Sequence, residues 1–151
     1  MGLLHTVLPA MRRYVLVGGF TLLTACTSLP TAERPRLIDQ LGGEPGVRLV
    51  VDRTLERVAK DPRTRRTFDG VRLSTLQRNV GDYVCQVADG GCVYEGETMK
   101  RAHADLNLGG SEFDVMVQVL REELDRAGAS TAAKNELLRR LAPTRRDIVA
   151  R

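Results

Sequence analysis

The sequence predicts an all-α domain over residues 36–151, with two long helix pairs. Apolar residues recur there at spacings of three and four, which is the pattern of amphipathic helices. Glycine pairs and prolines separate these stretches, and no alternation of apolar and polar residues is long enough for a strand. With 151 residues, of which 42% are apolar, the chain can form one domain with a packed core.

Residues 1–25 have the features of an export signal of the lipoprotein type. Arg12 and Arg13 precede an uncharged run that is too short to span a membrane comfortably. The run ends in Leu-Thr-Ala-Cys, closing at Cys26, and this ending resembles the bacterial lipobox, whose cysteine is acylated and becomes the mature N-terminus. An ordinary signal beside a coincidental cysteine is the alternative.

Acylation of Cys26 would hold the protein on a lipid bilayer, outside the cytoplasm and facing the periplasm if the source has two membranes. Residues 26–35 then form a tether, because prolines and small polar residues disfavour regular structure. The start is either Met1 or Met11, and residues 1–10 would be an over-extended start in the second case, because Met11 alone begins a compact signal.

The first two predicted helices are separated by glycines. We expect a short helix over 37–41, which Gly42-Gly43 ends. A longer helix follows over 45–60, because a proline suits its first turn and Asp61-Pro62 ends it. Phe68 is then a lone aromatic in a loop.

Two further helices are expected before the C-terminal pair. One begins at Ser74, a good N-cap residue, and stops at 89–91. The other covers 98–108 and carries His103 on an otherwise apolar face. That face also holds Met99, Ala102 and Leu106.

The C-terminal pair shows a capping pattern and a proline break. Ser111 with Asp114 three residues later is similar to a capping box, with Asp in place of Glu or Gln, and the helix that it starts ends at Gly128. The last helix covers 131–149, and Pro143 should kink or divide it.

His103 is the one imidazole that remains after the leader, because the other histidine is His5. A core histidine hydrogen-bonded to a backbone carbonyl is one interpretation. A single imidazole cannot build a zinc site, which needs three or four ligands. It can hold a haem iron, which needs one proximal ligand and an apolar slot. Aromatics are only 4% of the chain, so the core is either aliphatic or completed by a ligand.

Short sequence pieces with a specific order and spacing support the haem interpretation. They are Leu41-Gly42-Gly43, Val50-Val51-Asp52-Arg53, Glu56-Arg57-Val58, Asp61-Pro62, Phe68, Gly90-Gly91, Tyr94-Glu95-Gly96, Met99-Lys100, Ala102-His103, Phe113-Asp114, Leu141-Ala142-Pro143 and Arg146-Asp147-Ile148-Val149. Together they resemble the group I truncated haemoglobins, the small two-over-two helical globins, over residues 37–149. The resemblance implies a two-over-two helical sandwich that holds haem b and binds a diatomic gas.

The resemblance also implies roles for individual residues. His103 falls at the position of the proximal iron ligand, and Phe68 at that of the aromatic that packs on the porphyrin. Lys100 is either a contact to a haem propionate or a solvated lysine. The other expected pocket residues are Leu55, Leu76, Val80, Val84 and Met99.

The expected distal side is apolar, unlike that of most relatives. Thr54-Leu55 stands where the family commonly has Phe-Tyr, whose tyrosine donates a hydrogen bond to the gas, and Val80 stands where Gln is frequent. We therefore expect weak binding of dioxygen relative to carbon monoxide, and a five-coordinate ferrous haem. Thr54 and Tyr83 are the two side chains that could still supply a donor.

Two functions of different classes fit these observations. One is a lipid-anchored globin that carries, scavenges or senses dioxygen, nitric oxide or carbon monoxide. The other is a haem-free globin fold that serves as an interaction module. A nitric oxide dioxygenase would also need a reductant, which the sequence does not identify. Outside the leader 21 basic and 19 acidic residues leave a charge of +2, so no nucleic-acid partner is expected.

Export would permit a disulfide between Cys85 and Cys92. Cys85 is expected on the side of its helix that faces away from Leu76, and Cys92 lies just past the helix end. Two unpaired thiols are the alternative, because the sequence does not set the Cα separation.

Overall fold

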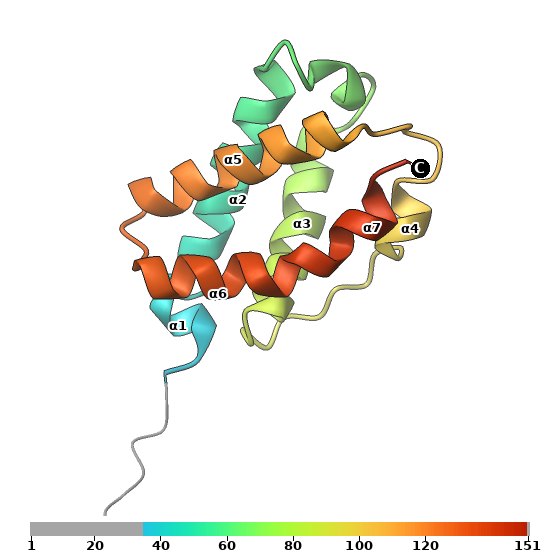
Figure 1. Cartoon of the computed structure of the whole chain (residues 1–151). Helices are drawn as coiled ribbons and strands as arrows, with labels where there is room; N and C mark the ends of the chain where they lie inside the picture. Colours follow the sequence, from blue (N-terminus) through green and yellow to red (C-terminus); the bar gives the residue numbers. More distant parts are fainter. Residues whose placement is uncertain (1–34, 151) are drawn as a thin grey trace, which may run out of the picture. The chain divides into compact units, whose positions relative to one another are not determined.

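A computed structural model of the chain describes residues 35–150, and all its regular elements in that range are helical (Figure 1). The elements are α1 (Leu37–Gln40), α2 (Gly43–Lys60), the 3₁₀ turn η1 (Arg65–Phe68), α3 (Leu73–Val87), α4 (Met99–Ala102), α5 (Gly110–Arg126), α6 (Thr131–Leu141), the 3₁₀ turn η2 (Ala142–Thr144) and α7 (Arg145–Ile148). None of the helices described is long and apolar enough to cross a membrane. The expected export signal, with Cys26, lies outside these residues.

Two antiparallel helix pairs form the body of this fold. The first pair is α2 with α3, and the second is α5 with α6, which crosses in front of it in Figure 1. Helix α2 packs against both α3 and α5 and so joins the two layers. The prediction of an all-α fold with two long helix pairs is confirmed.

The core between the layers is aliphatic. Its buried apolar residues are Leu37, Ile38, Leu41, Val47, Val50, Val51, Leu55, Val58, Val84, Cys85, Ala88, Val115, Val119, Leu124, Ala133 and Leu137. Each large side chain in this set contributes about 1.5–3 kcal/mol when fully buried. The four aromatic side chains of residues 35–150 all remain partly exposed. None of these four aromatic side chains therefore belongs to the fully buried core.

A buried carboxylate links the two layers. Glu123 of α5 is 3% exposed, and its Oε1 accepts a hydrogen bond of 2.7 Å from Nη1 of Arg57 on α2. Arg126 also donates to this carboxylate from the next turn of α5. A buried charge is costly unless it is paired, so separating α2 from α5 at this point would leave the Glu123 carboxylate without its Arg57 partner.

The helix starts differ from the sequence predictions at two places. The N-cap of α3 is Arg72, so Ser74 lies inside the first turn. The start of α5 is closed by Glu112, whose Oε2 accepts from the backbone N–H of Gly109 at 2.9 Å. The predicted pair of Ser111 and Asp114 is wrong because the Asp114 carboxylate pairs with an arginine of α7.

Three other predictions about where helices begin and end can be compared with the structure. The helix expected over 98–108 is only Met99–Ala102, because its apolar face is not buried: Leu106 is 40% exposed. A short helix without packing is unstable in water. Phe68 ends the 3₁₀ turn η1 instead of lying in a loop. Pro143 divides the last helix as predicted.

Two ion pairs that Glu136 forms within α6 give a test by pH. Hydrogen bonds from Arg139 and Arg140 lower the pKa of Glu136 from 4.5 to about 2. The stabilisation is therefore present above pH 4.5 and is lost as the pH falls toward 2. We expect Glu136→Gln to lower Tm at pH 7 and to flatten the dependence of Tm on pH between 4.5 and 2.

Thermal unfolding across this pH range, followed by circular dichroism, measures both effects. Glu95→Gln is the matched control, because Glu95 is exposed and forms no ion pair among the residues of the structure that are described. Identical pH profiles for the two variants would contradict the assignment.

Candidate functional site

His103 is oriented by the short helix that precedes it. Thr98 caps α4 by accepting a hydrogen bond of 3.3 Å from the N–H of Arg101, and His103 follows directly after the last helical residue. The Nδ1 atom of His103 lies 2.7 Å from the carbonyl oxygen of Met99. A carbonyl only accepts, so Nδ1 carries the proton, and in the neutral ring Nε2 keeps the lone pair. This arrangement is the one that metal-ligating histidines adopt.

Two pockets lie between α4 and the C-terminal segment. The larger, about 490 Å³, is lined by Lys100, His103, Ala104, Asn107, Arg146, Asp147, Ile148, Val149 and Ala150. The smaller, about 360 Å³, is lined by Tyr83, Tyr94, Gly96, Thr98, Met99, Arg140, Pro143, Thr144 and Asp147. Asp147 borders both pockets. Met99 at the start of α4 thus lines one pocket, and His103, just after its end, lines the other.

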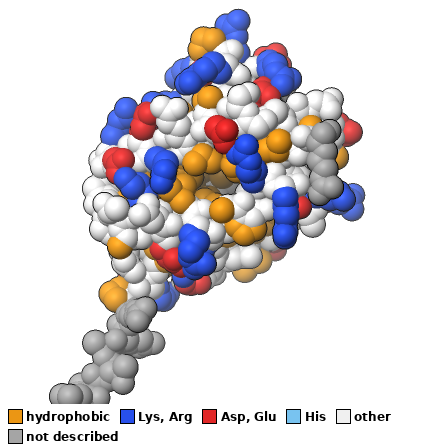
Figure 2. Space-filling model, in the orientation of Figure 1, with side chains coloured by type: hydrophobic (Ala, Val, Ile, Leu, Met, Phe, Trp, Pro, Cys, Tyr) orange, Lys and Arg blue, Asp and Glu red, His pale blue; other side chains and the backbone are white. Residues whose placement is uncertain are grey.

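An apolar surface on α2, η1 and α3 faces the second helix layer. Leu55 and Val84 are buried in the core, while Phe68, Leu76 and Val80 are half-buried and pack against it. Figure 2 shows a hollow walled by hydrophobic side chains, with lysines and arginines around it.

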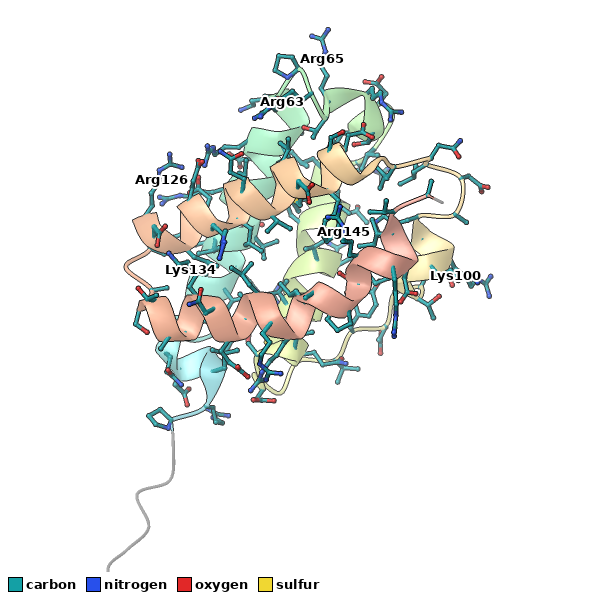
Figure 3. All side chains as sticks on the ribbon, viewed as in Figure 1. Arg63, Arg65, Lys100, Arg126, Lys134 and Arg145 are labelled. Atoms are coloured by element: carbon teal, nitrogen blue, oxygen red, sulfur yellow. A yellow bond between two sulfur atoms is a disulfide. The ribbon has the colours of Figure 1, made fainter. Side chains whose placement is uncertain are left out.

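Arg145 lies between α5 and α7 beside this region (Figure 3). It pairs with Asp114, and its guanidinium lies 5.0 Å from the centre of the Phe113 ring. The cation therefore stays at the rim of the apolar surface.

The structure brings together only some of the residues predicted from the sequence. Lys100 shares the larger pocket with His103, and Met99 lines the smaller one. Five others, from α2, η1 and α3, line neither pocket and belong either to the core or to the half-buried apolar side chains packed against it. They are Leu55, Phe68, Leu76, Val80 and Val84.

The sequence predictions missed the contribution of the C-terminal segment. Arg146 and Asp147 line the pockets, as do the apolar Ile148 and Val149, which the sequence placed only on an apolar helix face. The available signal was the break at Pro143, which turns the chain across α4.

Thr54 and Tyr83, the two candidate hydrogen-bond donors, lie in different surroundings. The Thr54 hydroxyl is buried and donates to the carbonyl of Val50 at 2.7 Å, so its proton is already used within α2. Tyr83 lines the smaller pocket, and its ring meets that of Tyr94 edge to face at 5.2 Å. Burial raises the pKa of Tyr83, with smaller effects from Tyr94 and Asp147. Tyr83 therefore remains a protonated donor at neutral pH.

Cys85 and Cys92 form a disulfide, with their Cα atoms 5.7 Å apart. Of the two alternatives that the sequence left open, the bonded pair is therefore the one present. Glu44 lies close to both sulfur atoms, but sulfurs bonded to each other do not offer thiolates to a metal ion.

Comparison with known proteins agrees with this geometry. The bacterial-like globin family matches residues 36–150. The group 1 truncated hemoglobin GlbN of Nostoc commune is 31% identical over 94 residues, which cover 62% of this chain and 80% of that protein. The group 1 truncated hemoglobin of Tetrahymena thermophila is 24% identical over 119 residues, covering 79% of this chain and 98% of that protein.

Two solved structures share the fold. The truncated hemoglobin of Tetrahymena pyriformis, in its Fe(III) form, has a TM-score of 0.73 at 25% identity and covers 76% of this chain and 98% of its own. A 2/2 hemoglobin from a Synechococcus species, with covalently attached heme, has a TM-score of 0.72 at 24% identity, over 78% of this chain and 100% of its own. The chain belongs to the group 1 truncated hemoglobins, and the expected two-over-two helical sandwich is confirmed.

Proposed function

We propose that this protein binds haem b through Nε2 of His103 and takes a diatomic gas for carriage, scavenging or sensing. The observation that carries the proposal is the contact of 2.7 Å between His103 Nδ1 and the Met99 carbonyl, which leaves Nε2 as a ligand in a pocket. Membership of the truncated hemoglobins supports it, because the relatives are hemoglobins.

The residues present fit a flat apolar cofactor with two carboxylates. Phe68, Leu76 and Val80 offer half-buried apolar surface that packs on the core. Lys100 and Arg146 line the same pocket as His103 and can pair with propionates. The haem iron, when bound, supplies reversible coordination of a small gas. The chain's part is to hold the ring, exclude water and set which gas is favoured.

Gas preference follows from the scarcity of hydrogen-bond donors on the α2 and α3 side. Leu55, Leu76 and Val80 cannot donate, and the Thr54 proton is held by Val50. Dioxygen gains from a donor because its outer atom gathers negative charge, whereas carbon monoxide gains much less. The proposal therefore includes weak dioxygen binding relative to carbon monoxide, with Tyr83 as the remaining donor nearby.

We also propose that the protein is exported and anchored to a membrane of the cell envelope by acylated Cys26. Support comes from the lipobox-like Leu-Thr-Ala-Cys sequence. The Cys85–Cys92 disulfide supports export too, because structural disulfides persist mainly outside the reducing cytoplasm.

His103→Gly tests the iron ligand. We expect the variant to lose the Soret band of the reconstituted protein, because the haem iron loses its protein ligand. Imidazole added to the solution should restore the band. Rescue separates ligation from a structural role. A variant that retains haem and spectrum without imidazole would refute the assignment. If the wild type itself shows no Soret band after reconstitution, the haem-free interaction module is the remaining function.

Lys100→Ala tests the propionate contact. Haem transfer to an excess of apomyoglobin should be about two- to fivefold faster than from the wild type, as expected for one partly exposed ion pair. Arg101→Ala is the control, because Arg101 is exposed, pairs with Glu97 and lines neither pocket. Equal rates for both variants and the wild type would leave Lys100 a solvated lysine.

Leu55→Tyr tests the apolar distal side. The added hydroxyl should slow dioxygen dissociation by roughly tenfold and leave carbon monoxide almost unchanged, as measured by stopped flow. Thr54→Val is the control and should alter neither rate. If dioxygen already dissociates slowly from the wild type and Tyr83→Phe makes its dissociation fast, Tyr83 is the donor and the apolar description is wrong.

Cys26→Ser tests the anchor. Expressed in a bacterial host that processes lipoproteins, the wild type should sediment with membranes, and the variant should move to the soluble fraction of the envelope. Cys92→Ser is the matched control, because it removes a cysteine without touching the signal. A Cys26→Ser protein that stays with the membrane would show that the lipobox interpretation is wrong.

A further inference from the structure

The segment between α3 and α4, residues 91–97, is attached to α3 only by contacts that each involve a side chain. Within residues 35–150, the backbone of residues 91–97 takes part in no backbone–backbone hydrogen bond. Three contacts attach the segment to α3 instead: the disulfide between Cys85 and Cys92, the Tyr94 N–H to Gln86 Oε1 at 2.8 Å, and the edge-to-face contact of Tyr94 with Tyr83. The disulfide is the only covalent one among them.

The end of α3 does not depend on the disulfide. The N–H of Gly90 donates to the Cys85 carbonyl at 2.8 Å, and the N–H of Ile38 in α1 donates to the Ala88 carbonyl at 2.7 Å. Arg140 of α6 donates to the Val87 carbonyl at 2.8 Å. Cleavage of the disulfide would therefore release the segment and leave the helix in place.

The segment leads directly to His103. Thr98, the N-cap of α4, follows its last residue, and Tyr94 and Met99 line the same pocket. The helix α4 has one turn and packs against α7. Its position relative to α3 is thus set by α7 on one side and by the disulfide-tethered segment on the other.

We propose that the Cys85–Cys92 disulfide is a thiol-exchange site that controls how firmly His103 is held, with a protein dithiol as the reductant. The inference rests on the proposed haem function for its consequence, because a loosened His103 retains haem less well. The bond and its effect on α4 concern this chain's own residues and can be tested without haem.

The two sulfurs differ in access, and this sets the order of exchange. Cys85 is 0% exposed, whereas Cys92 is half-buried. The first thiolate of the dithiol attacks Sγ of Cys92, the bond to Cys85 breaks, and Cys85 leaves as a thiolate that takes up a proton. The second thiol of the dithiol then displaces Cys92 as a thiol. The protein gains two electrons and two protons, and the dithiol is oxidised to a disulfide.

Hydrogen exchange of the full chain, read by mass spectrometry, tests the release directly and needs no haem. After reduction with dithiothreitol, the hydrogen-bonded amides within residues 91–103, those of Tyr94, Arg101 and Ala102, should exchange at least about tenfold faster, because the covalent constraint is gone. Peptides from α2 and from residues 76–84 should be unchanged, and reoxidation should restore protection. Unchanged exchange in 91–103, or equal acceleration in α2, would overturn the proposal.

Haem transfer to apomyoglobin tests the consequence on the haem-loaded chain. Reduced wild type and Cys92→Ser should both lose haem roughly tenfold faster than the oxidised wild type, the size expected when a ligand loses its support. Dithiothreitol should not change the rate of Cys92→Ser, which controls for effects on haem itself. Transfer from reduced wild type at the oxidised rate would overturn the proposal. Failure to bind haem at all would refute the proposed function, while hydrogen exchange would still decide the release.

Trapping of the mixed disulfide tests the order of attack. A single-cysteine thioredoxin-type reductant should be captured on Cys92, as read by peptide mass. Capture on Cys85 would overturn the assigned exchange site.

Discussion

The last turn of α3 is the junction at which α1, α6 and the segment leading to α4 are all attached. Helix α1 donates to the Ala88 carbonyl there, Arg140 of α6 reaches the preceding carbonyl, and the segment that leads to α4 starts from the disulfide of Cys85 and Cys92. The junction is closely packed: a Cβ atom on Gly90 would lie 2.5 Å from Sγ of Cys85. Only glycine lets the chain reverse at this distance, so the backbone turn that receives α1 and precedes Cys92 requires glycine at this position.

The long helices could be predicted from the sequence because each carries an apolar stripe of several turns, which the core then buries. The short elements could not. The stretch around His103 shows helical spacing, but α4 stops after one turn because Leu106 stays 40% exposed. The capping prediction at α5 was wrong for a related reason. Asp114 has the right spacing, but an arginine 31 residues later occupies its carboxylate.

A residue of the candidate site could be predicted where its chemical type alone singled it out. It could not be predicted where its position depends on the packing of segments that are distant in sequence. His103 could be singled out because the chain has only one other histidine, His5, in the stretch predicted to be a signal. Arg146 and Asp147 could not, because their place beside α4 follows from the turn after Pro143 and from packing of α7. The disulfide was undecided for the same reason, since a turn of a few residues sets whether two Cα atoms come within bonding range.

The aliphatic core has a consequence for optical measurements on the folded protein. With no tryptophan in the chain, near-ultraviolet absorption and emission of the haem-free protein come mainly from its three tyrosines. Within residues 35–150 the tyrosines are Tyr83 and Tyr94, which touch each other at the wall of one pocket. Their emission therefore reports on the pocket wall and on the attachment of the segment that carries Tyr94. Valine and leucine side chains do not absorb near-ultraviolet light, so their repacking in the core produces no signal of its own. Tyrosine fluorescence therefore reports on the pocket wall, whereas helix content reports on the helices around the aliphatic core.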